Sequence, residues 1–227
     1  MDSESKRFSA FASPPCFAHE LEYTADGFNI RDSTEQADVN RWRDAQRQRL
    51  IGFRQGLPIA ERDHLALNII DEIKQQVDLG KDICISVYWP YRGEPSLHEL
   101  MSSCHSNGAR IALPVVIDKQ SPLIFRQWTP GCELERGVLK IPIPTNGTEL
   151  IPNVVIAPLV GFDRQCYRLG YGGGYFDRTL AAMSPRPFII GIGHRGLELE
   201  TIYPQAHDIP MDIIVTGKGQ VLQRSDN

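Results

Sequence analysis

The stretch from Tyr167 to Leu180, YRLGYGGGYFDRTL, combines residue types that suit phosphate binding. Gly170 and Gly172–Gly174 lie within five positions and precede an apolar-periodic run that carries an acid, Asp177. Bare glycines let backbone N–H groups converge on an anion, and a helix N-terminus adds favourable partial charge. Arg168 can supply a full positive charge just before the loop. The spacing matches neither the P-loop nor the dinucleotide fingerprint, so a tight turn before a helix with an N-terminal acid stays open as the alternative.

The bulk composition allows one globular domain and argues against several classes of protein. The chain has 227 residues, of which 41% are hydrophobic, and this suffices for a sizeable core. The formal net charge of −4 does not indicate a nucleic-acid binder in bulk. No apolar run reaches the roughly 18 residues of a membrane span, and the N-terminal segment does not read as a signal peptide. Five scattered cysteines without a CxxC pair favour free thiols in a reducing cytoplasm.

Helical and strand patterns alternate along most of the chain. A helix is predicted from Asp38 and a second over residues 60–77, where apolar residues recur every four positions. Short runs rich in Val and Ile follow, with helical segments between some of them. These patterns predict an α/β fold: a single three-layer domain with a mostly parallel sheet covered by helices on both faces. The domain is expected to span residues 37–218, with a partly disordered tail at 1–36 and a C-terminal tail at 219–227.

The longer string GFDRQCYRLGYGGGYFDRTL strongly resembles the signature of the 5-formyltetrahydrofolate cyclo-ligase family, also called methenyltetrahydrofolate synthetases. Other stretches are similar to further motifs of that family, in the family's order: YWPYRGEPSLHEL, PLIFRQW, GVLKIPIP and HDIPMDIIVTG. The resemblance covers roughly residues 40–218. It implies a ligase that uses ATP as co-substrate together with Mg²⁺.

The resemblance also implies which residues hold ATP and the metal. The family's ATP-binding positions fall on Arg43, Arg47, Arg168, Leu169, Gly170, Tyr171, Gly172, Gly173, Gly174, Tyr175 and Phe176. Asp177 and Asp212 match its magnesium ligands, and Arg168 and Asp177 are the implied catalytic residues. Mg²⁺ in such sites takes one or two carboxylates plus phosphate oxygens and waters. Arg43 and Arg47 are four positions apart and share a helical face, although a solvated basic face would also explain them.

The implied folate contacts come from two parts of the chain. They are Trp89, Glu94, Tyr171, Gly172, Gly173, Gly174 and Tyr175. Trp89 offers a flat apolar face for a pterin or benzoyl ring, with ordinary core packing as the alternative. Glu94 offers an acceptor for pterin N–H groups. Both residues follow a predicted strand at the carboxyl edge of the sheet, where open α/β sheets place ligands.

Three positions depart from the family pattern. Cys166 replaces a turn glycine, His194 replaces an aromatic residue, and Leu197 replaces a glutamine. The departures leave open the exact folate contacts and, with them, the exact folate substrate.

The implied reaction is cyclisation of 5-formyltetrahydrofolate to 5,10-methenyltetrahydrofolate, with release of ADP and phosphate. Phosphorylation of the formyl oxygen gives an iminophosphate that N10 attacks, so no covalent nucleophile is required and no cysteine is assigned a catalytic role. Two alternatives stay open: a paralogue that acts on another formylated or pterin-like substrate, and a folate- or nucleotide-binding protein without turnover. The expected partners are these small molecules, with no nucleic acid and no membrane, in a monomer or weak dimer.

Overall fold

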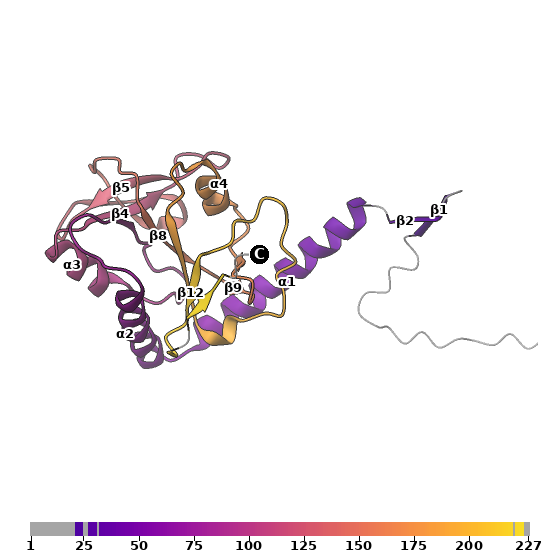
Figure 1. Ribbon diagram of the computed structural model, residues 1–227, viewed down its shortest axis with the longest axis horizontal. Coiled ribbons are helices and arrows are strands. Elements are labelled where there is room, and N and C mark those ends of the chain that lie inside the picture. Colours follow the sequence, from indigo (N-terminus) through magenta and orange to yellow (C-terminus); the bar gives the residue numbers. More distant parts are fainter. Residues whose placement is uncertain (1–20, 25–26, 31, 220, 225–227) are drawn as a thin grey trace, which may run out of the picture. The chain divides into compact units, whose positions relative to one another are not determined.

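The computed structural model describes residues 21–24, 27–30, 32–219 and 221–224 (Figure 1). Residues 1–20 and 225–227, which belong to the two predicted tails, lie outside the described part. The chain divides into two compact units, Met1–Trp42 and Arg43–Asn227. Within the described ranges, no helix is both long enough and apolar enough to cross a membrane.

The first unit holds a hairpin and the start of helix α1. Strands β1 (Leu21–Thr24) and β2 (Gly27–Ile30) pair antiparallel, within the segment 1–36 that we expected to be a tail. Helix α1 spans Asp32–Gly56, so it begins six residues before the predicted start at Asp38. The additional residues, DSTEQA, include the residue types favoured at a helix N-terminus but lack the apolar periodicity from which the helix was predicted.

The second unit is built on a seven-stranded sheet. In spatial order its strands are β13 (Leu222–Gln223), β12 (Ile213–Val215), β11 (Phe188–Ile192), β8 (Val154–Pro158), β3 (Cys84–Ser86), β4 (Arg110–Val115) and β5 (Ile124–Trp128). The five strands from β12 to β4 pair in parallel, and β13 and β5 are antiparallel to their neighbours. The predicted mostly parallel sheet is confirmed. Strand β13 lies in the segment 219–227 that we expected to be a tail.

Helices cover both faces of this sheet, which confirms the three layers (Figure 1). The helices that follow α1 are α2 (Ile59–Gln76), α3 (His98–Ser106) and α4 (Tyr175–Ala182). Because side chains alternate between the faces of a strand, Val154 and Ile156 of β8 join one core cluster, whereas Val155 and Ala157 join another. Helices α2 and α3 complete the first cluster, and α1 and α4 complete the second.

Short elements occupy the connections between the main strands. They are β6 (Leu134–Arg136), β7 (Pro142–Pro144), β9 (Gly161–Phe162), β10 (Arg168–Leu169) and the 3₁₀ turns Val138–Lys140 and Arg195–Leu197. Strand β6 pairs with β7 and β9 pairs with β10, both antiparallel. The β9–β10 hairpin ends at Leu169, directly before Gly170, so it fixes the start of the glycine-rich segment.

The order of the strands defines a position for a ligand. From β3 the chain continues outward to β4 and β5, then returns to place β8 on the other side of β3, and continues outward to β11 and β12. In open parallel sheets, ligands bind outside the carboxyl ends of two neighbouring strands whose connections leave in opposite directions. In this sheet those two strands are β3 and β8.

Candidate active site

A cavity of about 480 Å³ lies at the carboxyl ends of β3 and β8. Tyr88 and Trp89, which follow β3 within three residues, line the cavity together with Pro158, the last residue of β8. Its volume falls in the range of small-molecule sites. The cavity therefore occupies the position that the strand order predicts for a ligand.

This cavity brings together most of the residues that the resemblance implied. Those that line it are Arg43, Arg47, Trp89, Glu94, Arg168, Gly170, Tyr171, Gly172, Gly173, Gly174, Tyr175, Phe176 and Asp177. Two predicted site residues, Leu169 and Asp212, do not line it. Leu169 is buried because it belongs to β10 and packs in the second core cluster.

The loop from Gly170 to Gly174 links β10 directly to α4. Two of its glycines adopt the left-handed conformation that side chains disfavour, with φ of +93° at Gly172 and +63° at Gly174. Gly174 is also the N-cap residue of α4, so the loop leads straight into a helix N-terminus. Gly173 has no positive φ, but a Cβ added there would lie 2.7 Å from the Tyr175 ring. The helix expected after the glycines is therefore present, and the two-residue strand β10 precedes the loop.

Two arginines lie against this loop. Arg47 donates from Nε to the carbonyl oxygen of Gly170 at 2.8 Å. Arg168 donates from Nη2 to Asp177 at 3.0 Å, while its Nε is buried and has no hydrogen-bond partner within the described ranges. A buried donor without a partner calls for an explanation, and an anionic ligand in the cavity would supply the missing acceptor. The arrangement of loop, helix start and guanidinium groups suits a phosphate.

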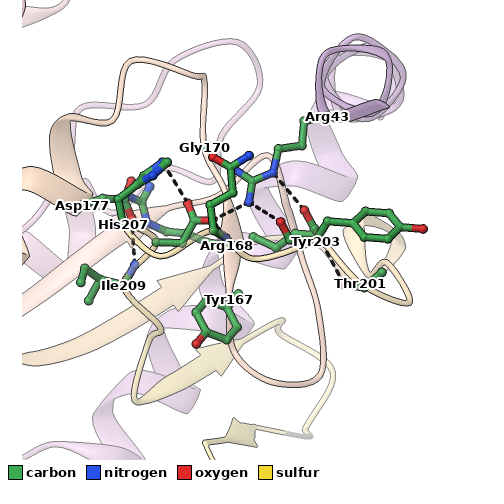
Figure 2. A network of polar contacts seen from close by, with 12 residues as sticks. Arg43, Tyr167, Arg168, Gly170, Asp177, Thr201, Tyr203, His207 and Ile209 are labelled. Carbon is green, nitrogen blue, oxygen red and sulfur yellow. Dashed lines mark hydrogen bonds and ion pairs between the residues drawn. The ribbon is translucent and has the colours of Figure 1, made fainter. Parts of the chain in front are cut away.

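Arg43 is held by another segment of the chain than Arg47 and Arg168 are. Figure 2 shows its contact with Tyr203. Its side chain is buried and donates to the carbonyl oxygens of Ile202 and Tyr203, both at 3.0 Å. It also pairs with Asp208, which lines the cavity together with His207. Arg43 therefore anchors the segment that forms one wall of the cavity. Asp208 is an acid at the cavity that the sequence analysis did not single out.

Of the two predicted metal ligands, only Asp177 lines the cavity. Asp177 lines the cavity in the first turn of α4, and its Oδ1 accepts from the Ile209 N–H at 3.3 Å (Figure 2). Asp212 instead accepts from the Ile189 N–H at 2.7 Å and from Arg186 at 2.8 Å. Within the described part of the chain, no three His, Cys, Asp or Glu side chains gather into a group that could hold a metal ion. Asp177 is thus the predicted metal ligand that faces the cavity.

Trp89 and Glu94 extend the cavity beyond the carboxyl end of β3. Trp89 packs partly against the first core cluster and meets the His98 ring edge-on, with 4.4 Å between ring centroids. The two roles considered for Trp89, core packing and a face for a ligand ring, are therefore compatible, since the side chain both packs on the core and lines the cavity. Glu94 is the buried acid of this part of the site, with a side chain that is 3% exposed.

Glu94 is held by hydrogen bonds on both carboxylate oxygens. Oε2 accepts from the Tyr91 N–H at 2.9 Å, and Oε1 accepts from the Tyr171 hydroxyl at 2.8 Å. Burial raises the pKa of Glu94 to about 7, against the smaller lowering effects of Arg54 and of these two hydrogen bonds. The carboxyl therefore changes its charge close to neutral pH.

Arg54 is the residue of this region that sequence reasoning left without a role. It is 2% exposed, bonds the Tyr171 hydroxyl and lies 3.7 Å from Glu94. A signal was present in the sequence. Arg43, Arg47 and Arg54 are separated by four and by seven positions, which places all three on one face of α1.

The three departures from the family pattern have separate structural settings. Cys166 has a φ of +64°, which explains why a glycine suits this turn. His194 contacts the Phe53 ring at 5.3 Å between centroids, and Leu197 is fully buried. Neither His194 nor Leu197 lines the cavity.

The fold and the cavity define an α/β protein with a small-molecule site at the switch point of a mostly parallel sheet. The chain belongs to the 5-formyltetrahydrofolate cyclo-ligase family, whose model matches residues 39–217, and it is an enzyme of the ligase class. This confirms the resemblance found in the sequence motifs.

Individual relatives agree with the family match. The 5-formyltetrahydrofolate cyclo-ligase of Haemophilus influenzae is 28% identical over 159 residues, which cover 67% of this chain and 81% of the relative. That of Escherichia coli K12 is 32% identical over 139 residues, 58% of this chain and 76% of the relative. The NMR structure of 5,10-methenyltetrahydrofolate synthetase from Aquifex aeolicus matches with a TM-score of 0.70 and 27% identity, over 82% of this chain and 94% of that one.

Proposed function

We propose that this protein converts 5-formyltetrahydrofolate to 5,10-methenyltetrahydrofolate in a reaction that requires ATP and Mg²⁺ and releases ADP and phosphate. The names of the relatives support this activity. The observation that carries it here is a single cavity with two regions. The phosphate region consists of the loop 170–174 with Arg47, Arg168 and Asp177, and the pterin region consists of Trp89 and Glu94. A phosphate donor and a folate must share one space in order to react.

The first step transfers a phosphoryl group. The formyl oxygen attacks the γ-phosphorus of ATP, the bond between this phosphorus and the bridging oxygen breaks, and ADP leaves. The transition state spreads negative charge over the phosphoryl oxygens, so it needs positive groups that are already in place. The Arg168 guanidinium and the N–H groups of the loop 170–174 supply them at the start of α4.

The second step closes the ring. N10 attacks the formyl carbon and loses its proton, the C–O bond breaks, and phosphate leaves with the former formyl oxygen. Glu94 would accept from pterin N–H groups, and Trp89 would contact the flat ring. No covalent intermediate on the protein is needed. Cys166 in particular is poorly suited to act as a nucleophile, because the thiol is fully buried and burial raises its pKa to about 11.

Asp177 fits a magnesium ion that is shared with nucleotide phosphates. Its carboxylate lines the cavity beside Arg168, and Mg²⁺ in such sites commonly takes one or two carboxylates plus phosphate oxygens and waters. When bound there, the ion would neutralise charge on the phosphates. Each of the two acids already pairs with an arginine and accepts from a backbone N–H, so these contacts do not distinguish them. Only Asp177 lines the cavity, and the geometry therefore supports Asp177 rather than Asp212 as the protein ligand.

The direct test follows the absorbance of the methenyl-folate product after the protein is mixed with 5-formyltetrahydrofolate, ATP and Mg²⁺. We expect product to form when all three are present, with one ADP released per product. Omission of any one of them, or addition of a chelator, should stop the reaction. Absence of product in the complete mixture would contradict the proposal.

The binding protein and the paralogue, which are the two alternatives, predict other results in calorimetry and in an assay of ADP release. A binding protein would show calorimetric binding of folate or nucleotide without ADP release. A paralogue would release ADP with a different formylated or pterin-like compound. Two of the residues that depart from the family pattern, His194 and Leu197, lie outside the cavity lining, so the structure gives the paralogue no support.

A further inference from the structure

Arg54 connects three loops of the site from a buried position. It donates from Nε to the carbonyl oxygen of Arg92 and from Nη1 to that of Leu159, both at 3.0 Å. Its Nη2 donates to the Tyr171 hydroxyl. Arg92 lies in the loop after β3, Leu159 directly follows β8, and Tyr171 lies in the glycine loop. One side chain of α1 therefore contacts the segments that follow both strands of the switch point and the loop that binds phosphate in our proposal.

The Tyr171 hydroxyl lies between Arg54 and Glu94. It accepts from Arg54 and donates to Oε1 of Glu94 at 2.8 Å, while Arg54 Nη2 itself is 3.7 Å from the same oxygen. The Arg54 guanidinium also lies over the Tyr171 ring, 5.7 Å from the centroid. Guanidinium, hydroxyl and carboxylate thus form a continuous hydrogen-bonded chain that joins the glycine loop to the acid of the pterin region.

The backbone around Glu94 depends on the same arginine. The loop turns through Arg92, with a φ of +46°, and Gly93, with a φ of +78°. A Cβ added at Gly93 would lie 3.1 Å from the carbonyl oxygen of Arg54. The Tyr91 N–H then donates to the second oxygen of Glu94. The close approach of this loop to α1 at Arg54 is therefore part of how the carboxylate is oriented.

Stability is a poor explanation for this buried cluster. The side chains of Arg54 and Glu94 are each 3% exposed, and two charges removed from water carry a desolvation penalty that their attraction offsets only with good geometry. Apolar residues of similar volume often replace such pairs without loss of stability. Location offers a better explanation, because Glu94 and Tyr171 line the cavity and Arg54 supports both of them from behind the lining.

We propose that Arg54 is a positioning residue for the cyclisation: acting through the Tyr171 hydroxyl, it holds the Glu94 carboxylate and the glycine loop in one fixed arrangement. The inference rests on the proposed function, in which Glu94 orients the pterin and the loop holds the triphosphate. The formyl oxygen must then meet the γ-phosphorus in line, and a displacement of about 1 Å can reduce the rate by about 100-fold. Tyr171 is the side chain that links the two regions.

The same contacts govern the charge of Glu94. The groups that face it are Arg54 from α1, Tyr171 from the glycine loop, and Tyr88 and Tyr91 from its own loop. Burial raises the pKa of Glu94, whereas Arg54 and the Tyr171 hydrogen bond lower it. Loss of either partner should therefore raise this pKa further, so that the carboxylate is protonated at a higher pH. An arginine that merely stabilised the fold would leave the pH dependence of catalysis unchanged.

The test compares the wild-type enzyme with Arg54→Met, Arg54→Lys, Tyr171→Phe and the control Arg49→Met. Arg49 belongs to the same helix but is exposed, where it donates to Gln46 at 2.8 Å. The control removes the same kind of side chain and the same charge. For each protein, kcat and the KM values for 5-formyltetrahydrofolate and ATP are measured across the neutral pH range, together with the melting temperature.

We expect Arg54→Met to lower kcat/KM for 5-formyltetrahydrofolate by about 100-fold and Tyr171→Phe by about 10-fold, with a smaller change in KM for ATP. Arg54→Lys should recover part of the loss, because lysine keeps the charge but not the planar fork of donors. In Arg54→Met and Tyr171→Phe, the acid limb of the pH profile should move to higher pH. Arg49→Met should match the wild-type enzyme.

Arg54→Met can also weaken the fold because it leaves Glu94 without a cation, so Tyr171→Phe, which removes one hydroxyl, is the deciding variant. If Tyr171→Phe and Arg54→Lys keep the wild-type kcat and pH profile, the positioning role is wrong. Product formation by the wild-type protein tests the proposed function separately. If the wild-type protein forms no product, calorimetry with 5-formyltetrahydrofolate decides: weaker binding by Tyr171→Phe than by Arg49→Met supports the role, and equal or absent binding overturns it.

Discussion

The phosphate region and the pterin region of the cavity are built in different ways. The phosphate region depends on backbone: two glycines with positive φ, a helix N-terminus and consecutive N–H groups, all within the short segment 170–177. The pterin region depends on side chains from distant parts of the chain. Its acid, Glu94, accepts from Tyr171 of the glycine loop, 77 positions away, and Arg54 of α1 supports both residues.

This difference indicates which substitutions each region can tolerate. In the phosphate region a change of backbone conformation should be severe, whereas a change of side chain that leaves φ unaltered should be mild. At Glu94, and at Arg54 and Tyr171 that support it, the loss of one charge or one hydroxyl should be severe, because these groups are buried and hydrogen-bonded to one another. Asp177 is an exception to the mild effect expected of side-chain changes in the phosphate region, because we assign the magnesium ion to its carboxylate. We therefore test it first.

The largest effect is expected for Asp177→Asn, compared with Asp212→Asn. The first variant replaces the charged ligand at the cavity, so kcat/KM for ATP should fall by about 100-fold or more and the Mg²⁺ concentration for half-maximal rate should rise. The second variant changes a carboxylate that bonds Ile189 and Arg186 away from the cavity, and it should mainly lower the melting temperature. Steady-state kinetics with varied ATP and Mg²⁺ measure both.

Two other outcomes would change this assignment. Equal kinetic losses in the two variants would mean that Asp212 also reaches the metal, as the family resemblance implies, and that its contacts to Arg186 and Ile189 are exchanged on binding. Unchanged activity and magnesium dependence in Asp177→Asn would mean that Asp177 is a residue of the helix start and no more.

The next largest effect concerns the glycines. Gly172→Ala and Gly174→Ala force a side chain onto positive φ, so KM for ATP should rise by about 10- to 100-fold. Gly173→Lys should retain activity, because φ is not positive there and the group in the way is the movable ring of Tyr175. ATP kinetics of the three variants decide the matter. A uniform response would show that the phosphate region does not depend on the backbone at individual glycines.

The contrast between the regions also explains what could be predicted from the sequence. The glycine loop, the helix after it and the parallel sheet arise from local composition and short-range periodicity, and the structure confirms them. Arg54 was missed because its partners are backbone carbonyls and a hydroxyl that only the fold brings near it. The predicted start of helix α1 is too late because the first residues of the helix carry no apolar period. Strand β13 was not predicted because it consists of two residues at a sheet edge.

A smaller effect is expected from the ionisation of Glu94. Its pKa, raised to about 7, means that the carboxyl becomes protonated at a higher pH than an ordinary glutamate. If the ionised form accepts from the pterin, KM for 5-formyltetrahydrofolate should rise by about 10-fold per pH unit below this pKa. Glu94→Gln should have a raised KM that no longer depends on pH in this range. KM for ATP serves as the control, because a limb shared by both substrates would assign the titration to another group.

The smallest effect is on stability and concerns the turn that presents the glycine loop. Cys166 has a φ of +64° and is fully buried between β9 and β10, where its carbonyl oxygen accepts from the Met211 N–H at 2.9 Å. Replacement by glycine relieves the strain but removes the thiol, whereas replacement by alanine removes the thiol and keeps the strain. Cys166→Gly should therefore be more stable than Cys166→Ala by about 1 kcal/mol.

For a unit of this size, that difference corresponds to about 2–4 °C in melting temperature. Urea unfolding of the two variants gives the free-energy difference directly, and the m-values show whether both unfold from the same folded state. If Cys166→Ala were as stable as Cys166→Gly, the turn could relax its backbone without cost. The phosphate region, whose glycine loop begins four residues after Cys166, would then depend less on a fixed backbone than we infer. Unchanged ATP kinetics in both variants would show that this strain is not transmitted to the loop.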